Sequence, residues 1–139
     1  MKLASKTVIL LLALGALTSA RGQYVADSID IGSRFFGRFA YNPTADVVYG
    51  TGDETRIFVA IDCASNQRVA VIESYSPGSV WFDSVDNKVF FEMCPDSLMV
   101  VDGVTHRRVR TIYVADMYLA GGAWSPEYNR LYFSLYDVD

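Results

Sequence analysis

The sequence predicts an all-β fold assembled from repeated four-stranded antiparallel sheets. Residues that fit a pleated, half-buried surface are plentiful, with nine Tyr, eight Phe and 51% hydrophobic residues among the 139. Short apolar runs alternate with turns that hold Asp, Asn, Gly, Ser or Pro, and no helical period is sustained after Ala20. The same pattern then returns at a nearly constant spacing.

Residues 1–20 have the layout of a secretory signal peptide. Lys2 and Lys6 form a short positive region, an apolar run follows over 8–17, and Thr18–Ala20 supplies small residues, so we expect cleavage after Ala20. A transmembrane anchor is the alternative, but the run is about ten residues long and a spanning helix needs about 20. We therefore expect an exported protein (periplasmic, secreted or at the cell surface) that is soluble after cleavage.

The charge balance excludes nucleic acid as a partner. Lys2 and Lys6 leave with the signal peptide, so ten of the 12 basic residues remain against 16 acidic ones. An acidic surface of this kind repels phosphate groups rather than binding them. We expect an unidentified protein or a small polar ligand as the partner.

Three segments that each begin with an aromatic residue reveal an internal repeat. They are Tyr41–Tyr49, Phe82–Phe90 and Trp124–Tyr132, and their first residues lie 41 and 42 positions apart. Each continues through polar turn residues and closes on an aliphatic–aromatic pair, which predicts two strands joined by a tight turn. We expect the opening aromatic residues to pack between repeated units.

A second pair of segments repeats in phase with the first set. Residues 58–72 and 98–112 each contain an apolar strand, an Asp, a Ser or Thr three positions later, a polar turn and another apolar strand. Asp side chains accept hydrogen bonds from the backbone two residues on. Asp62 and Asp102 are therefore interpreted as turn formers rather than catalytic acids.

A period of about 41 residues with four short strands per unit is typical of a β-propeller blade. A β-sandwich, the alternative fold, does not explain aromatic and Asp positions that recur in phase. We expect first strands that end at Tyr41, Phe82 and Trp124, second strands over Val47–Thr51, Lys88–Met93 and Arg130–Leu135, third strands over Ile57–Ile61 and Leu98–Val101, and fourth strands over Arg68–Glu73 and Arg108–Val114.

These strands predict a partial β-propeller of about two and a half four-stranded antiparallel blades plus a lone N-terminal outer strand. The expected divisions are a signal peptide over 1–20 and propeller repeats over 21–139, which comprise the lone strand 24–32, a blade 33–73, a blade 79–114 and a partial blade 118–139. Propellers typically have four to eight blades, so we expect an N-terminal piece of a longer protein. The alternatives are several copies that associate through unpaired blade faces, and the remnant of an interrupted gene.

The units resemble YVTN repeats, a β-propeller family of secreted and cell-surface proteins. The shared features are the aromatic-x-Pro openings at Tyr41–Pro43 and Trp124–Pro126, the pairs Val48–Tyr49 and Leu131–Tyr132, and the Asp-x-x-Ser/Thr turns at Asp62 and Asp102. The motif that names the family is approximated at residues 48–52 alone, and Asp83–Ser84 stands where a Pro is expected. The resemblance covers residues 24–139 and implies a propeller fold.

Cys63 and Cys94 are not expected to form a disulfide, although export would permit one. Cys63 follows a third strand and Cys94 follows a second strand of the next blade, at opposite ends of a blade. That places them about 15 Å apart at normal strand rise, whereas a disulfide needs Cα atoms within about 7 Å. Their spacing also matches no metal-binding motif.

One basic cluster occurs in the repeats, formed by His106, Arg107, Arg108 and Arg110. It is interpreted as a charged turn and outer edge strand that blocks edge-to-edge pairing. The alternative is a site for an anion or an acidic partner.

Four acidic residues are candidates for a ligand-binding face. They occupy the loops between second and third strands and between consecutive blades, which share one end of a propeller: Asp53, Glu54, Asp96 and Asp116. The alternative interpretation is solvated turn residues. The sequence contains no phosphate-binding loop, nucleophile motif or calcium loop, so we assign no catalytic, cofactor-binding or metal-binding residue.

We expect an exported binding or interaction scaffold rather than an enzyme, with no cofactor. The alternative is a propeller enzyme or a redox-enzyme subunit, of lyase or dehydrogenase type, whose active site lies in blades outside this sequence.

Overall fold

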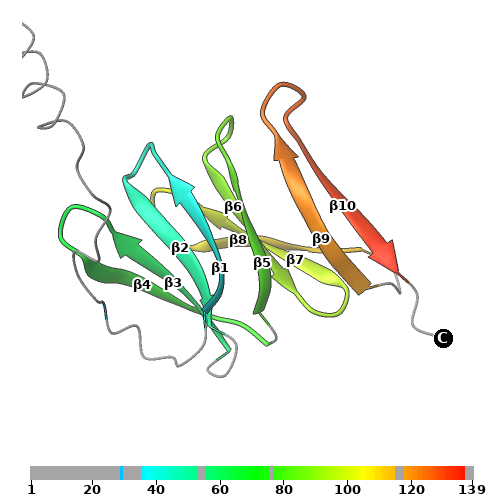
Figure 1. Ribbon diagram of the computed structural model, residues 1–139, viewed down its shortest axis with the longest axis horizontal. Helices are drawn as coiled ribbons and strands as arrows, with labels where there is room; N and C mark the ends of the chain where they lie inside the picture. Colours follow the sequence, from blue (N-terminus) through cyan, green and yellow to red (C-terminus); the bar gives the residue numbers. More distant parts are fainter. Residues whose placement is uncertain (1–28, 30–35, 53–55, 76, 115–117, 137–139) are drawn as a thin grey trace, which may run out of the picture.

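Ten antiparallel β-strands form three sheets in the described part of the chain (Figure 1). The computed structural model describes residue 29 and residues 36–52, 56–75, 77–114 and 118–136. Sheet 1 has the order β1-β2-β3-β4, sheet 2 the order β5-β6-β7-β8, and sheet 3 pairs β9 with β10. The strands are β1 Phe36–Asn42, β2 Val47–Gly52, β3 Ile57–Asp62, β4 Gln67–Glu73, β5 Pro77–Asp83, β6 Lys88–Met93, β7 Ser97–Asp102, β8 Arg108–Tyr113, β9 Tyr118–Ser125 and β10 Arg130–Tyr136.

The strands match the expectation from the sequence, and the all-β, partial-propeller fold is confirmed. Each predicted strand boundary lies within one residue of the boundary in the structure. The signal peptide expected over 1–20 and the lone strand expected over 24–32 lie outside the described residues, except for Ile29. Within the described ranges, no helix is long and apolar enough to cross a membrane.

Tight turns join the first and second strands of each sheet, and Asn or Asp side chains shape them. Asn42 Oδ1 accepts hydrogen bonds from the N–H groups of the second and third residues after it, at 2.9 and 3.2 Å. Asp83 Oδ1 does the same in sheet 2, at 2.8 and 3.0 Å. The turns end on left-handed residues at equivalent places, Asp46, Asn87 and Asn129, with φ of 53°, 51° and 50°. Asn and Asp tolerate this conformation better than other side chains do.

The turns between third and fourth strands confirm that Asp62 and Asp102 are turn formers. Asp62 Oδ1 accepts from the N–H and the hydroxyl of Ser65, at 2.7 and 2.5 Å. Asp102 Oδ1 accepts from the N–H and the hydroxyl of Thr105, at 2.9 and 3.1 Å. The Lys88 ammonium lies 2.6 Å from Asp102 Oδ2, and with the turn hydrogen bonds it holds the Asp102 pKa well below its ordinary value.

Each first strand carries a bulge, where its pairing register with the second strand shifts. In sheets 1 and 2 a side chain of the second strand accepts a hydrogen bond from the bulged backbone. The Arg38 N–H donates to Thr51 Oγ1 at 3.3 Å, and the Ser79 N–H donates to Oε2 of the buried Glu92 at 2.9 Å. The donors and the acceptors of these two bonds each lie one repeat apart in sequence, so the bulge belongs to the repeat.

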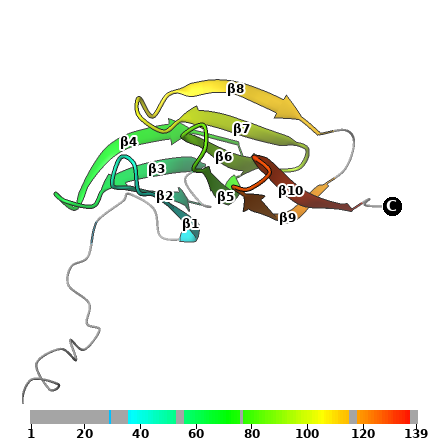
Figure 2. The ribbon, with the colours of Figure 1, turned by 90° about the horizontal axis from the view of Figure 1, so that it is seen from above.

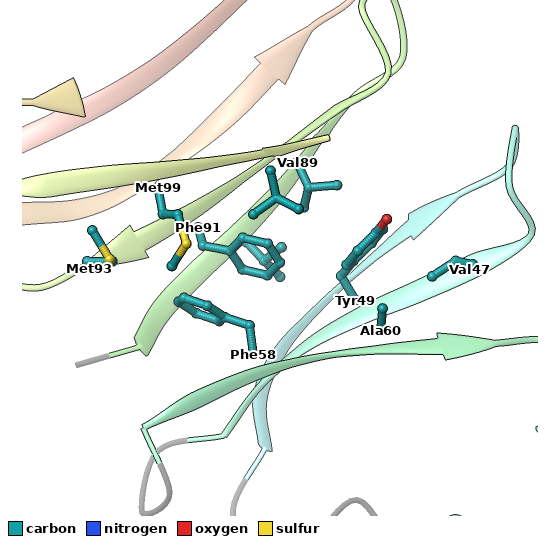
Figure 3. Close-up of a cluster of buried hydrophobic side chains, with 10 residues drawn as sticks. Val47, Tyr49, Phe58, Ala60, Val89, Phe91, Met93 and Met99 are labelled. Atoms are coloured by element: carbon teal, nitrogen blue, oxygen red, sulfur yellow. The ribbon is translucent and has the colours of Figure 1, made fainter. Parts of the chain in front are cut away.

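The sheets stack face to face, and the main core lies between sheets 1 and 2 (Figures 2 and 3). Phe91 from β6 stacks on Phe58 from β3 with ring centroids 4.1 Å apart, and it meets Tyr49 edge-on at 5.9 Å. All three side chains are fully buried. The other buried members of this cluster are Val47, Ala60, Val80, Val89, Met93, Met99 and Val101.

A second interface joins sheets 2 and 3. Phe90 stacks on Trp124 with ring centroids 6.2 Å apart, and Trp81 Nε1 donates to the carbonyl oxygen of Gly122 at 2.8 Å. A Cβ atom at Gly122 would lie 2.5 Å from the carbonyl oxygen of Tyr132. Glycine at this position therefore permits the close approach of β9 to β10.

Two of the three recurrent aromatic residues pack between sheets, and the third does not. Phe82 packs against the main core, and Trp124 packs against Phe90. Tyr41 departs from the expectation, because its half-exposed side chain donates to Asp46 Oδ1 at 2.8 Å within sheet 1. Side chains alternate along a strand, so Tyr41 lies on the face of sheet 1 that points away from sheet 2. No sheet of the described residues covers that face.

Removal of the Phe91 ring from the main core is expected to destabilise the fold strongly. Phe91→Ala should lower the free energy of unfolding by about 3–5 kcal/mol, because it leaves a cavity beside Phe58 and Tyr49. Urea unfolding followed by tryptophan fluorescence measures the change. Val104→Ala, in an exposed turn, is the control, and equal unfolding midpoints for the two variants would contradict the stacked core.

Candidate functional site

A groove opens between the outer parts of sheets 1 and 2, beside the turn that joins β6 to β7. Its volume is about 490 Å³, which lies in the range of small-ligand sites. One wall is formed by the end of β4 and the residues that follow it. The other wall is formed by the β6–β7 turn and by β8.

The groove brings together residues from two groups that were interpreted separately in the sequence, the acidic candidates for a ligand-binding face and the basic cluster. Asp96, a candidate of the ligand-binding face, lies in the β6–β7 turn and lines the groove. Arg108, from the basic cluster, begins β8 and lines the groove as well. The other three candidates of that face, Asp53, Glu54 and Asp116, lie outside the described residues.

Backbone hydrogen bonds hold the turn that carries Asp96. The carbonyl oxygen of Asp96 accepts from the N–H of Val114 at 2.7 Å, which ties the turn to the end of β8. The carbonyl oxygen of Pro95 accepts from the N–H of Leu119 at 3.3 Å, which ties the turn to β9. Asp96 is therefore carried by a turn that is anchored to two neighbouring strands.

Tyrosine and serine side chains add hydrogen-bonding groups to the groove. Tyr75 and Tyr113 line it and are 82% and 78% exposed. Each offers a flat ring and a hydroxyl group that both donates and accepts hydrogen bonds. Ser74 Oγ, also in the lining, is buried and has no hydrogen-bond partner within the described part of the chain. The groove thus combines aromatic surface with spare hydrogen-bonding capacity.

Charged groups of both signs line the groove. Glu73 and Asp96 supply carboxylates, and Arg108 supplies a guanidinium group that also donates a hydrogen bond to Thr111 Oγ1. Carboxylates bind hydrogen-bond donors and guanidinium groups bind acceptors, so this lining suits a ligand that carries both. Across the described ranges, no group of three or more His, Cys, Asp or Glu side chains is placed to hold a metal ion.

Cys63 and Cys94, both among the described residues, are not joined by a disulfide, as the strand order led us to expect. Cys94 lines the groove and donates a hydrogen bond to Glu92 Oε1 at 3.4 Å. Cys63 follows β3, in a turn at the opposite end of the strands. The two turns are too far apart along the strands for a disulfide to form.

A buried polar link joins sheets 1 and 2 at the end of the sheets opposite the groove. Asn42 Nδ2 donates to Asn87 Oδ1 at 2.9 Å and to the carbonyl oxygen of Gly103 at 3.1 Å. The Tyr49 hydroxyl lies 3.3 Å from the same carbonyl oxygen and 2.8 Å from His106 Nδ1. Burial raises the pKa of Tyr49 to about 12 and lowers the pKa of His106.

This link was not predicted from the sequence. His106 was grouped with the arginines that follow it, but its ring contacts Tyr49 while Arg108 lines the groove. The sequence did contain one signal for this contact, because the residue at this position differs between the two repeats. His106 occupies the left-handed position, with φ of 56°, that Asn66 occupies in sheet 1 with the same φ. Asn is the ordinary residue for such a turn, so a His there indicates an additional contact.

The His106 contact predicts a pH-dependent stability. Burial lowers the His106 pKa in the folded state, and the Asp102 carboxylate opposes only part of this shift. The unfolded state therefore binds a proton more readily, and the free energy of unfolding should fall as the pH drops below about 6.5.

His106→Asn tests this expectation, because it keeps the left-handed turn, as Asn66 does, and removes the ring that titrates. Urea midpoints are compared at pH 8 and pH 5. The stability advantage of the wild type over the variant should be larger at pH 8 than at pH 5. An advantage of the same size at both pH values would argue against the contact.

The comparisons with known proteins bear on the fold. No protein-family model matches this chain, and no curated protein matches its sequence. Solved structures that contain β-propellers match its fold, among them the following two. A chain of the mitotic checkpoint complex has a TM-score of 0.62 and 15% identity, over 71% of this chain and 32% of that chain. Hydrazine synthase from Kuenenia stuttgartiensis has a TM-score of 0.64 and 14% identity, over 81% of this chain and 32% of that chain.

This chain therefore spans about a third of the length of each of these two structures. At such low identity the likeness establishes a propeller-like fold and no function, because unrelated functions share this fold.

Proposed function

We propose that this chain belongs to an exported β-propeller of the YVTN type and serves as a binding scaffold, with the groove between sheets 1 and 2 as its ligand site. The observation that carries the proposal is the groove of about 490 Å³, lined by Asp96 and Arg108 and by the exposed Tyr75 and Tyr113. A concave site with aromatic surface and a few polar groups is typical of ligand binding.

The lining favours a small polar ligand. Glu73 and Asp96 can accept hydrogen bonds, and Arg108 can donate them. The rings of Tyr75 and Tyr113 can pack against flat apolar faces of a ligand. A short oligosaccharide has both features, since its rings present apolar faces and its hydroxyl groups both donate and accept. We therefore assign the groove to an oligosaccharide.

The proposed export and the proposed family rest on the sequence. The positive, apolar and small-residue regions of residues 1–20 follow the order of a signal peptide. The aromatic-x-Pro openings at Tyr41 and Trp124 and the Asp turns at Asp62 and Asp102 support YVTN-type repeats. The turn geometry of both Asp residues agrees with that family pattern.

Residues 1–20 are expected to direct export and then to be removed. A fusion of residues 1–30 to an alkaline phosphatase without its own signal should be active, because that enzyme needs disulfides that form outside the cytoplasm. A fusion with Leu11→Arg and Leu12→Arg should lose this activity, since the apolar run is broken. The intact mass of the exported full-length product should correspond to a chain that begins at Arg21. A product that retains Met1 would contradict cleavage.

The groove is expected to bind a soluble oligosaccharide. A glycan array identifies candidates, and isothermal titration measures saturable binding of each one to the full chain. Asp96→Asn removes a charged hydrogen-bond acceptor, and Tyr113→Ala removes a stacking surface. Each change should weaken binding about tenfold or more, because each interaction is worth roughly 1–3 kcal/mol.

Matched controls distinguish the groove from the rest of the surface. Arg107→Gln and Tyr128→Ala change exposed residues that do not line the groove, and both should leave the affinity unchanged. The absence of saturable binding to any glycan on the array would reject an oligosaccharide ligand. Binding that is insensitive to Asp96→Asn and Tyr113→Ala would reject the groove as the site.

A further inference from the structure

The groove between sheets 1 and 2 carries its carboxylates at one end. Glu73 belongs to the sheet 1 wall and is the last residue of β4, where it pairs with the first residue of β3. Asp96 belongs to the sheet 2 wall, and its carbonyl oxygen accepts from the N–H of the residue that follows β8. Both carboxylates therefore lie at the end of the groove where β4 and β8 finish.

The guanidinium group of the lining belongs to the other end of β8. Arg108 begins this strand and Tyr113 ends it, and their partners on β7, Val101 and Ser97, are four residues apart. At normal strand rise this separates the two backbone positions by roughly 13 Å. The guanidinium group also donates a hydrogen bond to Thr111 Oγ1 of its own strand. Two carboxylates and one guanidinium group give the described lining a net negative charge.

Each wall adds a tyrosine at the carboxylate end. Tyr75 follows β4 two residues after Glu73, and Tyr113 occupies in β8 the place that Glu73 occupies in β4. Both tyrosines are largely exposed and line the groove. The face of an aromatic ring attracts a cation. A cation at this end would therefore meet a carboxylate and an aromatic ring from each wall.

A buried hydroxyl group at the same end also points to a ligand. Ser74 lies between Glu73 and Tyr75, and its Oγ atom has no hydrogen-bond partner within the described residues. A buried polar atom without a partner is unfavourable. Rotation about the Cα–Cβ bond can turn this hydroxyl group toward a polar group of a ligand in the groove.

We propose that the groove selects oligosaccharides that carry a free amino group, and that it holds the ammonium at the end formed by Glu73, Asp96, Tyr75 and Tyr113. The inference rests on the proposed function, because it specifies the class of oligosaccharide for the same groove. An ammonium group donates three hydrogen bonds, and the carboxylates accept such bonds strongly. A sugar that carries a carboxylate or a sulfate would meet like charge at this end.

Two tetrasaccharides that differ in one group test the selection. One consists of β-1,4-linked glucosamine with free amino groups. The other has the same rings and linkages but is N-acetylated throughout, so it has no positive charge. Isothermal titration of the full chain at pH 6, where the free amino groups are largely protonated, should show about tenfold tighter binding of the first. Added sodium chloride should reduce this ratio, because salt screens exposed charges.

Neutral variants of the two carboxylates identify the groups that select. Glu73→Gln combined with Asp96→Asn should bring the ratio of the two affinities close to one, because the charges are lost and the shapes are kept. The ratio is the readout, since a purely structural change lowers both affinities together. Glu127→Gln removes an exposed carboxylate outside the groove and should leave the ratio unchanged.

Circular dichroism and urea midpoints establish that the variants are folded. Glu73→Gln alone, at an exposed position, replaces the double variant if that protein does not fold, and it should lower the ratio about threefold. Equal affinities for the two tetrasaccharides, tighter binding of the acetylated one, or a ratio that the carboxylate variants leave unchanged overturns the selection while the oligosaccharide site stands. The absence of saturable binding to any oligosaccharide rejects the proposed function itself, and this inference with it.

Discussion

The burial of sheet faces against one another holds the described part of this protein together. A four-stranded sheet with apolar side chains on both faces has no core of its own, so its stability comes from its neighbours. Phe91 provides the central contact, because its ring stacks 4.1 Å from Phe58 and meets Tyr49 edge-on. Equivalent positions recur about every 41 residues, and therefore one packing geometry is used from sheet to sheet.

Stacking gives the two ends of the sheets different properties. At one end, left-handed turns bring Asn42, Asn87 and His106 into polar contacts between sheets, and a Cβ atom at Gly103 would lie 2.4 Å from Asn87 Oδ1. At the other end, the turn that carries Asp96 lies apart from the end of β4, and the groove forms between them. The groove therefore lies at the end of the sheets that lacks these polar contacts.

Strands were predicted more accurately than the contacts between them. The predicted strand ends lie within one residue of those in the structure. Local hydrogen bonds, such as those of Asp62 and Asp102, decide where a strand stops. His106 and Arg108 were grouped by their proximity in sequence, but the left-handed backbone at His106 and the alternation of β8 direct them to different surroundings. The position of Tyr41 in the repeat predicts the face on which it lies, and it does not predict whether another sheet covers that face.

The amino-acid sequence alone predicts the all-β class, the order of the strands, the period of the repeat and the turn-forming roles of Asp62 and Asp102. These features depend on interactions between near neighbours in the chain or on a period that can be counted. The stacking of sheets 1 and 2 brings Ser74, Asp96 and Arg108 into one groove, and it places Tyr49 against His106, which is 57 positions away in sequence. Such contacts join separate sheets, and the distance between sheets is set by the packing of whole faces, which no local spacing encodes.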